Sequence, residues 1–402
     1  MRKGYLSQYF TAVASKRLSA VEALRHRSNQ HEFDGVNALK AMLGAGRRTF
    51  DARFVYLNDD DPEPVSDTGR LTWYDARENH PTRSEYRLYF TDTGVSTSAS
   101  EGDLLVIARR PDDSMLVIVA EQGSTMERQI LWLFGLSEAG HPGFSVKGEL
   151  ESDQTRLEFA SRYILEQIGV EIEETDENLL DTMLRKFNGS FPSTREFSAF
   201  ARSSVRGVAA DDDPDEAILA WITREEVLFR TLERHIIGDR LRRGFSDDVD
   251  GFIRFSLSVQ NRRKSRAGSA LENHLEHLFT AHGLRFSRTP RTEGRSKPDF
   301  LFPGEAEYHS PEFPATRLTM LGVKSSCKER WRQILAEADR ISPKHLLTLE
   351  PGISENQTEE MKVKNVVLVL PRSLLDTYSD GQRQWIMPIT AFMGLVSRRQ
   401  SC

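Results

Sequence analysis

The sequence predicts a chain of two domains, in which a mostly β N-terminal domain precedes an α/β domain with a mixed central sheet. The chain has 402 residues, which exceeds the usual size of one domain. Short strand-like runs dominate its first part, whereas helical and strand-like segments alternate in its last part. An acidic stretch with a central proline separates them at residues 208–216. We therefore expect domains over residues 1–175 and 217–402, joined by a linker over residues 176–216.

The N-terminal domain contains four strand-like runs bounded by turn residues. They cover residues 52–57, 86–90, 104–108 and 115–120. Pro111-Asp112-Asp113-Ser114 lies between the last two and predicts a hairpin turn there. The first 40 residues indicate mixed helical structure, and a further helix is expected near residues 155–167.

The C-terminal domain begins with helical patterns and continues with strands. Helices are expected over residues 223–241 and 269–280; in the second, Leu271, Leu275 and Leu278 share one face. Strands are expected over residues 299–302, 318–324, 345–349 and 366–370, with a helix over residues 331–340 between the second and third. This order favours a mixed sheet covered by helices.

The composition limits the class of protein. With 38% hydrophobic and 28% charged residues, the chain is neither disordered nor fibrous. It has no apolar run of 18 residues and no apolar segment behind its first five residues, so we expect neither a membrane span nor a secretory signal. Cys327 and Cys402 lie far apart and suggest free thiols in a reducing cytoplasm. We expect a soluble cytoplasmic protein without a membrane partner.

A basic run interrupts the overall acidic balance. The net charge is -6, yet residues 261–300 carry nine Lys or Arg residues against four Asp or Glu residues. Arg262, Arg263, Lys264 and Arg266 are therefore candidates for DNA binding, because local charge sets the potential that a polyanion meets. A solvated helix start or loop is the alternative interpretation of this run.

Three polar residues of the C-terminal domain form a candidate catalytic site. Asp299 opens one predicted strand, Lys324 closes the next one 25 residues later, and Glu337 follows on the predicted helix. Two carboxylates can hold Mg²⁺ through oxygen, and a lysine can orient water and offset charge on a phosphate. Each residue alone also fits a structural role, as a turn residue, a strand end or an exposed helix position. His274 and His277 could mimic a zinc pair, but they lack further clustered ligands and are interpreted as helix-surface histidines.

From about Asp215 to Tyr378, the chain resembles the catalytic part of EcoRII-type restriction endonucleases, within the PD-(D/E)xK nuclease superfamily. The resemblance rests on residues 258–268, 275–279, 297–303 and 324–338. It implies a restriction-endonuclease-like fold with Asp299, Lys324 and Glu337 as the active site, since this branch places the second carboxylate on the following helix. Gly322 stands where most of the superfamily carries that carboxylate.

The same resemblance assigns roles to neighbouring residues. Glu272 matches an acidic residue that can serve a second metal ion in relatives. Lys328, Glu329 and Arg330 match a segment that reads consecutive C·G pairs, which suits a carboxylate flanked by cations. A charged helix start is the alternative interpretation. The resemblance implies a CC/GG-containing palindrome.

The N-terminal part resembles, less closely, the B3-like effector domain of the same enzymes, which is a DNA-binding pseudobarrel. Residues 16–20, 74–77 and 82–87 carry this resemblance. Arg83, Glu85 and Arg87 are expected to alternate along one strand face, a solvated face being the alternative. Pro81 and Tyr86 depart from the relatives, which have cations there. The residues predicted to bind effector DNA are Arg83, Glu85, Arg87, Arg77, Arg25, Arg27, Asn29 and Gln30.

Together these features predict a bacterial type II restriction endonuclease that hydrolyses phosphodiester bonds in double-stranded DNA with Mg²⁺ and without a nucleotide cofactor. A palindromic target favours a homodimer. The resemblance further implies that the effector domain inhibits cleavage until it binds DNA. The alternatives are a DNA-binding regulator with an inactive nuclease fold and a repair or structure-specific nuclease.

Overall fold

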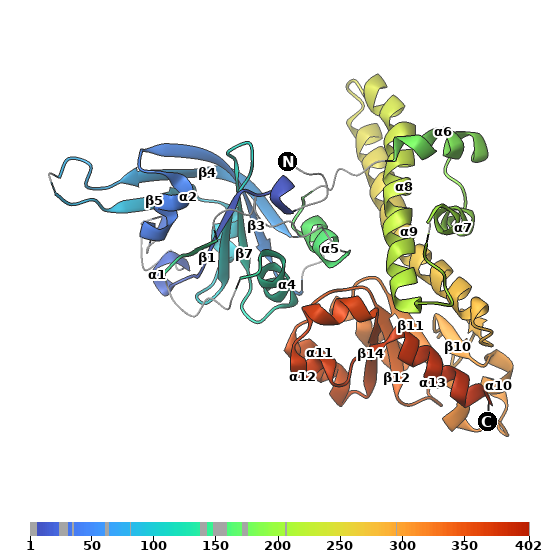
Figure 1. Ribbon diagram of the computed structural model, residues 1–402. Coiled ribbons are helices and arrows are strands. Elements are labelled where there is room, and N and C mark those ends of the chain that lie inside the picture. The colour runs from blue at the N-terminus through green and yellow to red at the C-terminus, as the bar shows by residue number, and fades with distance from the viewer. Residues whose placement is uncertain are drawn as a thin grey trace. The chain divides into compact units, whose positions relative to one another are not determined.

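A computed structural model describes residues 6–23, 31–33, 36–60, 64–80, 82–136, 143–147, 159–170, 176–205, 207–294 and 296–401. The chain divides into two compact units (Figure 1). The first comprises Met1–Ile172 with Pro351–Gln357, and the second comprises Glu173–Glu350 with Thr358–Cys402. Each unit is described by itself.

The first unit is built on an eight-stranded sheet with the order β2-β5-β4-β3-β7-β6-β1-β8. Strands β3 and β7 pair in parallel, and the other neighbours pair antiparallel. The strands are β1 (Ala12–Arg17), β2 (Glu32–Phe33), β3 (Arg48–Leu57), β4 (Val65–Asp75), β5 (Tyr86–Phe90), β6 (Leu104–Arg109), β7 (Met115–Ala120) and β8 (Ser145–Lys147). The mostly β domain is therefore confirmed, as is the hairpin, in which Arg109 of β6 pairs with Met115 of β7.

Short helices cover both faces of this sheet. In β6 and β7, alternate side chains enter two separate hydrophobic clusters, because successive residues of a strand point to opposite faces. The helical segments are η1 (Leu6–Gln8), α1 (Ala20–Ala23), η2 (Val36–Leu39), α2 (Lys40–Leu43), α3 (Gly94–Ser98), α4 (Thr125–Phe134) and α5 (Phe159–Gln167). Residues of α4 and α5 pack in the second cluster, so this sheet is buried on both sides.

The second unit contains a six-stranded mixed sheet with the order β14-β13-β12-β11-β10-β9. Its strands are β9 (Ser287–Arg288), β10 (Phe300–Phe302), β11 (Thr319–Lys324), β12 (Lys344–Thr348), β13 (Val366–Leu370) and β14 (Met387–Pro388). Strands β9, β10 and β11 pair antiparallel, whereas β11 to β14 pair in parallel. The predicted mixed sheet is confirmed.

Two long helices form the other part of the second unit. Helix α8 (Pro214–Arg243) and helix α9 (Val249–Ala281) run as a hairpin, with α6 (Glu177–Lys186) and α7 (Thr194–Ser204) beside it (Figure 1). Phenylalanines and leucines of α6, α7 and α8 share one hydrophobic cluster. The remaining helical segments are α10 (Glu305–His309), η4 (Ala315–Arg317), η5 (Lys328–Ala336), α11 (Glu355–Val363), η6 (Arg372–Thr377), α12 (Asp380–Arg383) and α13 (Ile389–Ser401).

Residues 176–216 differ from the expected linker, since they are largely helical and lie in the second unit. The acidic stretch that suggested a linker ends in the N-cap and first turn of α8. Asp213 caps this helix by accepting from the Asp215 and Glu216 amides, with Pro214 in the first turn. Asp215 is buried and accepts from the amides of Arg372 and Ile389 at 3.0 and 2.9 Å. Acidic residues are favourable at a helix N-terminus, so the pattern that indicated solvation was a capping signal.

The helix expected over residues 331–340 is also different. The chain forms the 3-10 segment η5 over Lys328–Ala336, and Glu337 follows its end. Among the described residues, no helix is both long and apolar enough to cross a membrane.

Candidate active site

Asp299 and Lys324 meet at one edge of the second sheet. Asp299 comes one residue before β10, and Lys324 is the last residue of the antiparallel neighbour β11. The Lys324 ammonium donates to Asp299 Oδ2 at 3.3 Å, and the Val323 amide donates to the same oxygen at 2.6 Å. The two side chains are only 15% and 16% exposed. The Asp299 carboxylate is thus fixed in place by the Val323 amide and the Lys324 ammonium together.

Glu337 faces the same site. Burial, together with the nearby Asp299 charge, raises the pKa of its carboxyl to about 7, although the Lys324 charge lowers it. Its Oε2 is buried and has no hydrogen-bond partner. The backbone beneath it is anchored, because the Lys344 ammonium donates to the Glu337 carbonyl. The structure therefore brings together the three residues that the sequence nominated.

The arrangement suits a hard divalent cation. Two carboxylates converge beside a lysine, and one buried carboxylate oxygen lacks a donor. Such an oxygen is costly unless it is hydrogen-bonded or coordinates a cation. Within the described residues, no group of three or more His, Cys, Asp or Glu residues could hold a metal ion. Mg²⁺ often binds through only one or two carboxylates and keeps several waters, so the Asp299 and Glu337 pair fits it.

Gly322 explains why a carboxylate is missing two residues before Lys324. A Cβ atom at Gly322 would lie 2.6 Å from Ile334 Cγ2, a methyl group of the buried η5 side chain. Segment η5 therefore packs directly on β11, and Glu337 follows the end of η5. The absence of a side chain at Gly322 thus allows the close packing that positions Glu337.

A Gly322→Ala substitution is expected to destabilise the second unit by about 1–3 kcal/mol, since overpacking a filled core forces neighbours to shift. Urea-induced unfolding measures this change. Gly268→Ala is the control, because a Cβ at this helical glycine meets no atom within 4 Å. If Gly322→Ala instead had the same effect as Gly268→Ala, or stabilised the protein, η5 would be able to shift away from β11 without loss of stability.

Glu337 should make stability depend on pH in the absence of metal. The unfolded carboxyl ionises near its ordinary pKa of 4.5, whereas the folded one keeps its proton up to about 7. The folded state then binds more protons between these values, so stability falls as pH rises through this window. A Glu337→Gln variant should match the wild type at pH 4.5 and be more stable by about 2 kcal/mol at pH 8, after allowance for partial solvent screening.

Thermal unfolding in EDTA at both pH values measures this difference. Glu359→Gln is the control, because the Glu359 side chain is exposed. A constant difference between Glu337→Gln and the wild type at the two pH values would contradict the raised pKa.

The comparisons with known proteins cover part of the chain. A family model described as EcoRII C terminal matches residues 229–393. The match covers less than half of this chain. The type II restriction enzyme EcoRII of Escherichia coli is 44% identical over 226 residues, which cover 56% of this chain and 55% of that enzyme. The chain therefore spans about half the length of this curated relative.

Two solved structures are also similar to the chain. The match to metal-depleted Ecl18kI in complex with uncleaved, modified DNA covers 57% of this chain and 86% of the Ecl18kI chain, with a TM-score of 0.45 and 19% identity. Metal-depleted Ecl18kI in complex with uncleaved DNA covers 56% and 84%, with a TM-score of 0.43 and 19% identity.

Glu272, which lies within the matched residues, has a cationic partner. Its carboxylate accepts from Arg288 at 2.9 Å, and the same guanidinium bonds Glu276 at 2.5 Å and the Asn273 side chain at 2.9 Å. These bonds raise the pKa of Arg288 in spite of its burial. A second metal ion at Glu272 remains a prediction and would have to compete with Arg288.

The basic run lies on α9, and its described arginine side chains contact other residues of the second unit. Arg266 is buried and donates to Glu225 at 3.0 Å. Arg263 pairs with the buried Glu233 at 2.6 Å, and the Arg262 guanidinium lies 4.4 Å from the centre of the Phe191 ring. The Lys264 side chain is outside the described part of the chain. A DNA-binding role for this run stays a prediction, although these partners favour a structural role for Arg266.

His274 also belongs to this buried cluster. Its Nε2 lies 3.0 Å from Glu225, and its Nδ1 lies 3.0 Å from the Arg202 guanidinium. Burial lowers the pKa of the imidazole. His274 is therefore buried rather than on the helix surface as we expected.

The predicted base-reading segment opens η5. The side chains of Lys328 and Glu329 lie outside the described part of the structure, whereas Arg330 is exposed. The backbone before them is firmly held, because the Cys327 amide donates to the buried Glu350 carboxylate at 2.5 Å. Burial and the Glu350 charge raise the pKa of the Cys327 thiol well above its usual value. A fixed start of η5 is suited to presenting Arg330 outward.

In the first unit, the predicted effector residues form a charged network. Glu85 accepts from Arg77 at 2.5 Å and from Arg87 at 2.9 Å, which lowers the pKa of its carboxyl. Arg87 also pairs at 2.7 Å with Glu32, a residue that sequence reasoning missed because it lies 55 positions away. The network draws on β2, β5 and the β4–β5 connection.

Two details of the effector prediction differ. Strand β5 begins at Tyr86, so Arg83 and Glu85 precede it instead of alternating along it. Tyr86 is a core residue, stacked on Trp73 with ring centres 4.8 Å apart, so it is not available for DNA contact. Arg25, Arg27, Asn29, Gln30 and Pro81 lie outside the described residues.

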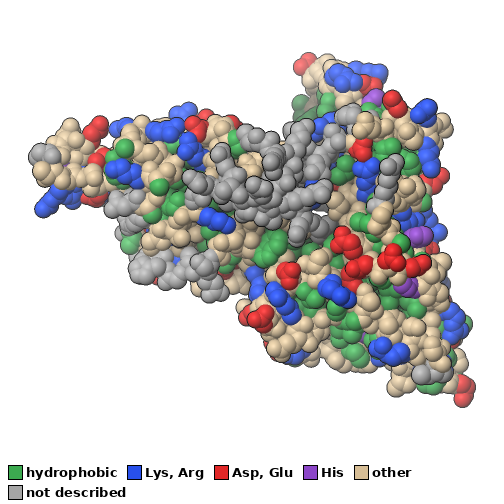
Figure 2. All heavy atoms as spheres, viewed as in Figure 1, with side chains coloured by type: hydrophobic (Ala, Val, Ile, Leu, Met, Phe, Trp, Pro, Cys, Tyr) green, Lys and Arg blue, Asp and Glu red, His purple; other side chains and the backbone are tan. Residues whose placement is uncertain are grey.

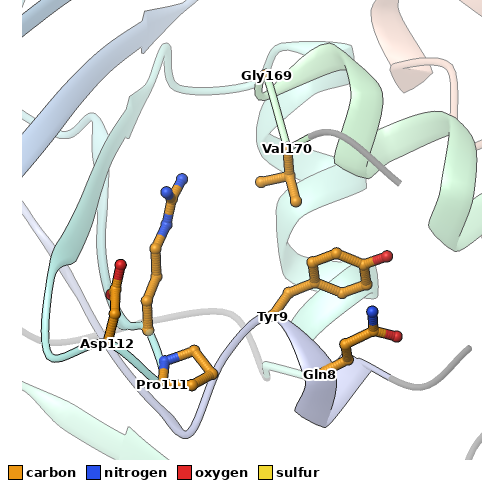
Figure 3. A pocket seen from close by; sticks show the side chains of 7 residues that line it. Gln8, Tyr9, Pro111, Asp112, Gly169 and Val170 are labelled. Atoms are coloured by element: carbon orange, nitrogen blue, oxygen red, sulfur yellow. The ribbon is translucent and has the colours of Figure 1, made fainter. Parts of the chain in front are cut away.

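A separate hollow of about 450 Å³ lies in the first unit. Figure 3 shows Tyr9 and Val170 on one side of it and Pro111 and Asp112 on the other. None of the predicted site residues lines it.

Proposed function

We propose that the protein is a Mg²⁺-dependent type II restriction endonuclease that hydrolyses phosphodiester bonds at a CC/GG-containing palindrome in double-stranded DNA. The observation that carries the proposal is the convergence of Asp299, Lys324 and Glu337 at one sheet edge within the residues matched by the EcoRII C-terminal family model. The similarity to the type II restriction enzyme EcoRII, at 44% identity, supports the same reaction. A bacterial, cytoplasmic location accords with this function.

Each residue of the site has a distinct task in this reaction. Asp299 and Glu337 would hold the metal ion, which supplies a Lewis acid for the phosphate oxygens. Lys324 is fixed by its bond to Asp299 and would offset the negative charge that grows on the phosphate in the transition state. The partial burial of all three side chains lowers the local dielectric constant, so these charges act more strongly than in water.

Recognition would come from Lys328, Glu329 and Arg330. A carboxylate accepts from cytosine N4, while Arg or Lys donates to guanine O6 and N7 in the major groove. The proximity of η5 to the catalytic edge would couple base reading to cleavage, since Glu337 directly follows this segment. We propose a homodimer, because a two-fold enzyme matches a palindrome and each active site cuts one strand.

Plasmid cleavage with Mg²⁺ tests the function, with wild type compared against Asp299→Ala and an EDTA control and the ends sequenced. Discrete fragments that disappear in both controls are expected. Failure of the wild type to cut plasmids rich in CC/GG palindromes, even with added site oligonucleotides, would favour a DNA-binding regulator. Cutting without a defined palindrome would favour a repair or structure-specific nuclease.

We further propose that the first unit is a B3-like effector domain that restrains cleavage until it binds DNA. Arg77, Arg83, Glu85 and Arg87 would contact effector DNA, together with Arg25, Arg27, Asn29 and Gln30. The charged network around Glu85 supports this role, because guanidinium groups there are already oriented.

Removal of residues 1–172 is expected to raise the cleavage rate on single-site DNA. Truncation should stop there and not near residue 205, because α6 and α7 pack with α8 in the second unit. The rate is measured on plasmids with one and with several sites, and circular dichroism checks that the truncated protein is folded. An unchanged or lower rate in folded protein would contradict inhibition by the first unit.

A further inference from the structure

Glu337 lacks the side-chain support that fixes Asp299. The Asp299 carboxylate accepts from the Val323 amide and from the Lys324 ammonium. Within the described residues, Glu337 Oε2 has no hydrogen-bond partner, although this oxygen is buried. Glu337 also follows the end of η5 and belongs to no helix or strand. The direction of its carboxylate therefore depends on how the backbone around it is held.

Hydrogen bonds from several segments of the second unit restrain this backbone. The Glu337 amide donates to the Ile334 carbonyl at 3.1 Å, which closes η5. The Ser296 hydroxyl donates to the Ala336 carbonyl at 3.1 Å. The Lys344 ammonium donates to the carbonyl of Glu337 itself. Lys344 thus contacts the main chain of the proposed metal-binding residue directly.

The chain turns sharply after Glu337. Ala338 has a φ of 52°, in the left-handed region that residues with a Cβ atom rarely adopt. Such a conformation persists where surrounding contacts enforce it. The Ala338 carbonyl accepts from the Ile341 amide at 2.9 Å, and the Lys344 ammonium donates to the same oxygen at 3.5 Å. Lys344 therefore binds two successive carbonyls of this turn.

Lys344 stands on a fixed part of the sheet. It is the first residue of β12, and its amide donates to the Asn365 carbonyl at 3.1 Å. Figure 2 shows many Lys and Arg side chains at the surface, whereas the Lys344 side chain is half-buried. An ammonium has three donors and no acceptor, so it can serve two carbonyls at once. These features suit a group that holds the backbone in place.

We propose that Lys344 is a positioning residue of the metal site, whose ammonium fixes the turn at Glu337 and Ala338 and so keeps the Glu337 carboxylate near Asp299. The inference rests on the proposed function for the identity of the ligand, Mg²⁺. Because the Glu337 carboxylate has little support of its own, release of its backbone would weaken metal binding. Groups that orient metal ligands typically contribute about 10–100-fold to metal affinity or activity.

A Lys344→Met variant of the full-length protein tests the proposal, because methionine keeps the apolar part of the side chain and removes the donor. Mg²⁺ should raise the melting temperature of the wild type, and Asp299→Ala should lose this effect. Lys344→Met should need about 10–100 times more Mg²⁺ for the same rise. Lys344→Arg should recover most of the lost affinity, because a guanidinium also donates to carbonyls.

The dependence of cleavage on Mg²⁺ separates positioning from a general loss of structure. Lys344→Met should raise the Mg²⁺ concentration at half-maximal rate, while its rate at saturating Mg²⁺ should approach that of the wild type. A fraction of unfolded protein would instead lower the maximal rate and leave the half-maximal concentration unchanged. Lys364→Met is the matched control, since Lys364 is an exposed lysine just before β13. It should behave as the wild type in both measurements.

The proposal is overturned if Mg²⁺ fails to stabilise the wild type, if Lys344→Met responds to Mg²⁺ as the wild type does, or if Lys344→Arg is as impaired as Lys344→Met. A parallel loss of affinity for duplex DNA would make Lys344 a DNA contact instead. If Mg²⁺ stabilises the protein through Lys344 but DNA is never cut, the nuclease proposal fails while this inference stands. If the wild type cuts and Lys344→Met keeps its Mg²⁺ dependence, only this inference fails.

Discussion

A Lys324→Met variant is expected to lose about 10³-fold in cleavage rate while remaining folded and able to bind duplex DNA. Methionine keeps the length and apolar part of the side chain but removes the ammonium that bonds Asp299 at 3.3 Å. The charge that grows on the phosphate would then lack its fixed cation in a partly buried site. The effect should appear in the single-turnover cleavage rate, with only a small change in the DNA dissociation constant.

The matched control is Lys362→Met, because Lys362 is an exposed lysine of α11. It should cleave at the wild-type rate. If Lys324→Met kept more than a tenth of wild-type activity, a group other than Lys324 would compensate the negative charge on the phosphate. Loss of DNA binding in parallel with cleavage would instead make Lys324 a binding residue.

The sequence was sufficient to predict that Asp299 and Lys324 lie at the same sheet edge, because strand ends fix positions. Asp299 precedes one short apolar strand and Lys324 ends the next, and antiparallel neighbours bring such ends to the same edge. Strands β5, β7 and β13 were predicted at their observed limits, since turn residues bound each apolar run. Strand β4 was missed, because none of its first six residues is buried and only Leu71 and Trp73 of the strand are buried.

The hydrophobic pattern alone was insufficient to predict the backbone conformation around Glu337. Trp331 and Ile334 are buried three residues apart, and this spacing suits an α-helix and a 3-10 helix equally. The sequence predicted a helix past Glu337, whereas the close contact of Ile334 with Gly322 favours the tighter segment that ends before it. Side-chain partners were harder still to predict, because Glu225 and Arg266 lie 41 positions apart on different helices.

An Arg266→Met variant is expected to lose about 3–5 kcal/mol of stability, since it strands a buried carboxylate. The side chains of Arg266 and Glu225 are 8% and 5% exposed. The Arg266 guanidinium also lies over the Phe197 and Phe229 rings, 4.3 and 4.5 Å from their centres. Methionine would fill part of this space but would leave Glu225, among the described residues, with its contact to His274 at 3.0 Å. Urea-induced unfolding of the variant measures the loss, which would be a large share of a typical domain's stability.

Arg262→Met tests whether the basic run acts through stability or through DNA. Arg262 is only half-buried against Phe191, so its replacement should cost less than about 1 kcal/mol. If Arg266 instead contacts DNA, as the charge pattern predicts, Arg266→Met should keep its stability and lose affinity for duplex DNA. A buried ion pair requires the Arg266 guanidinium to be buried, whereas a phosphate contact requires it to be exposed. The free energy of unfolding and the affinity for duplex DNA therefore distinguish these two roles. The burial of Arg266 favours the loss of stability.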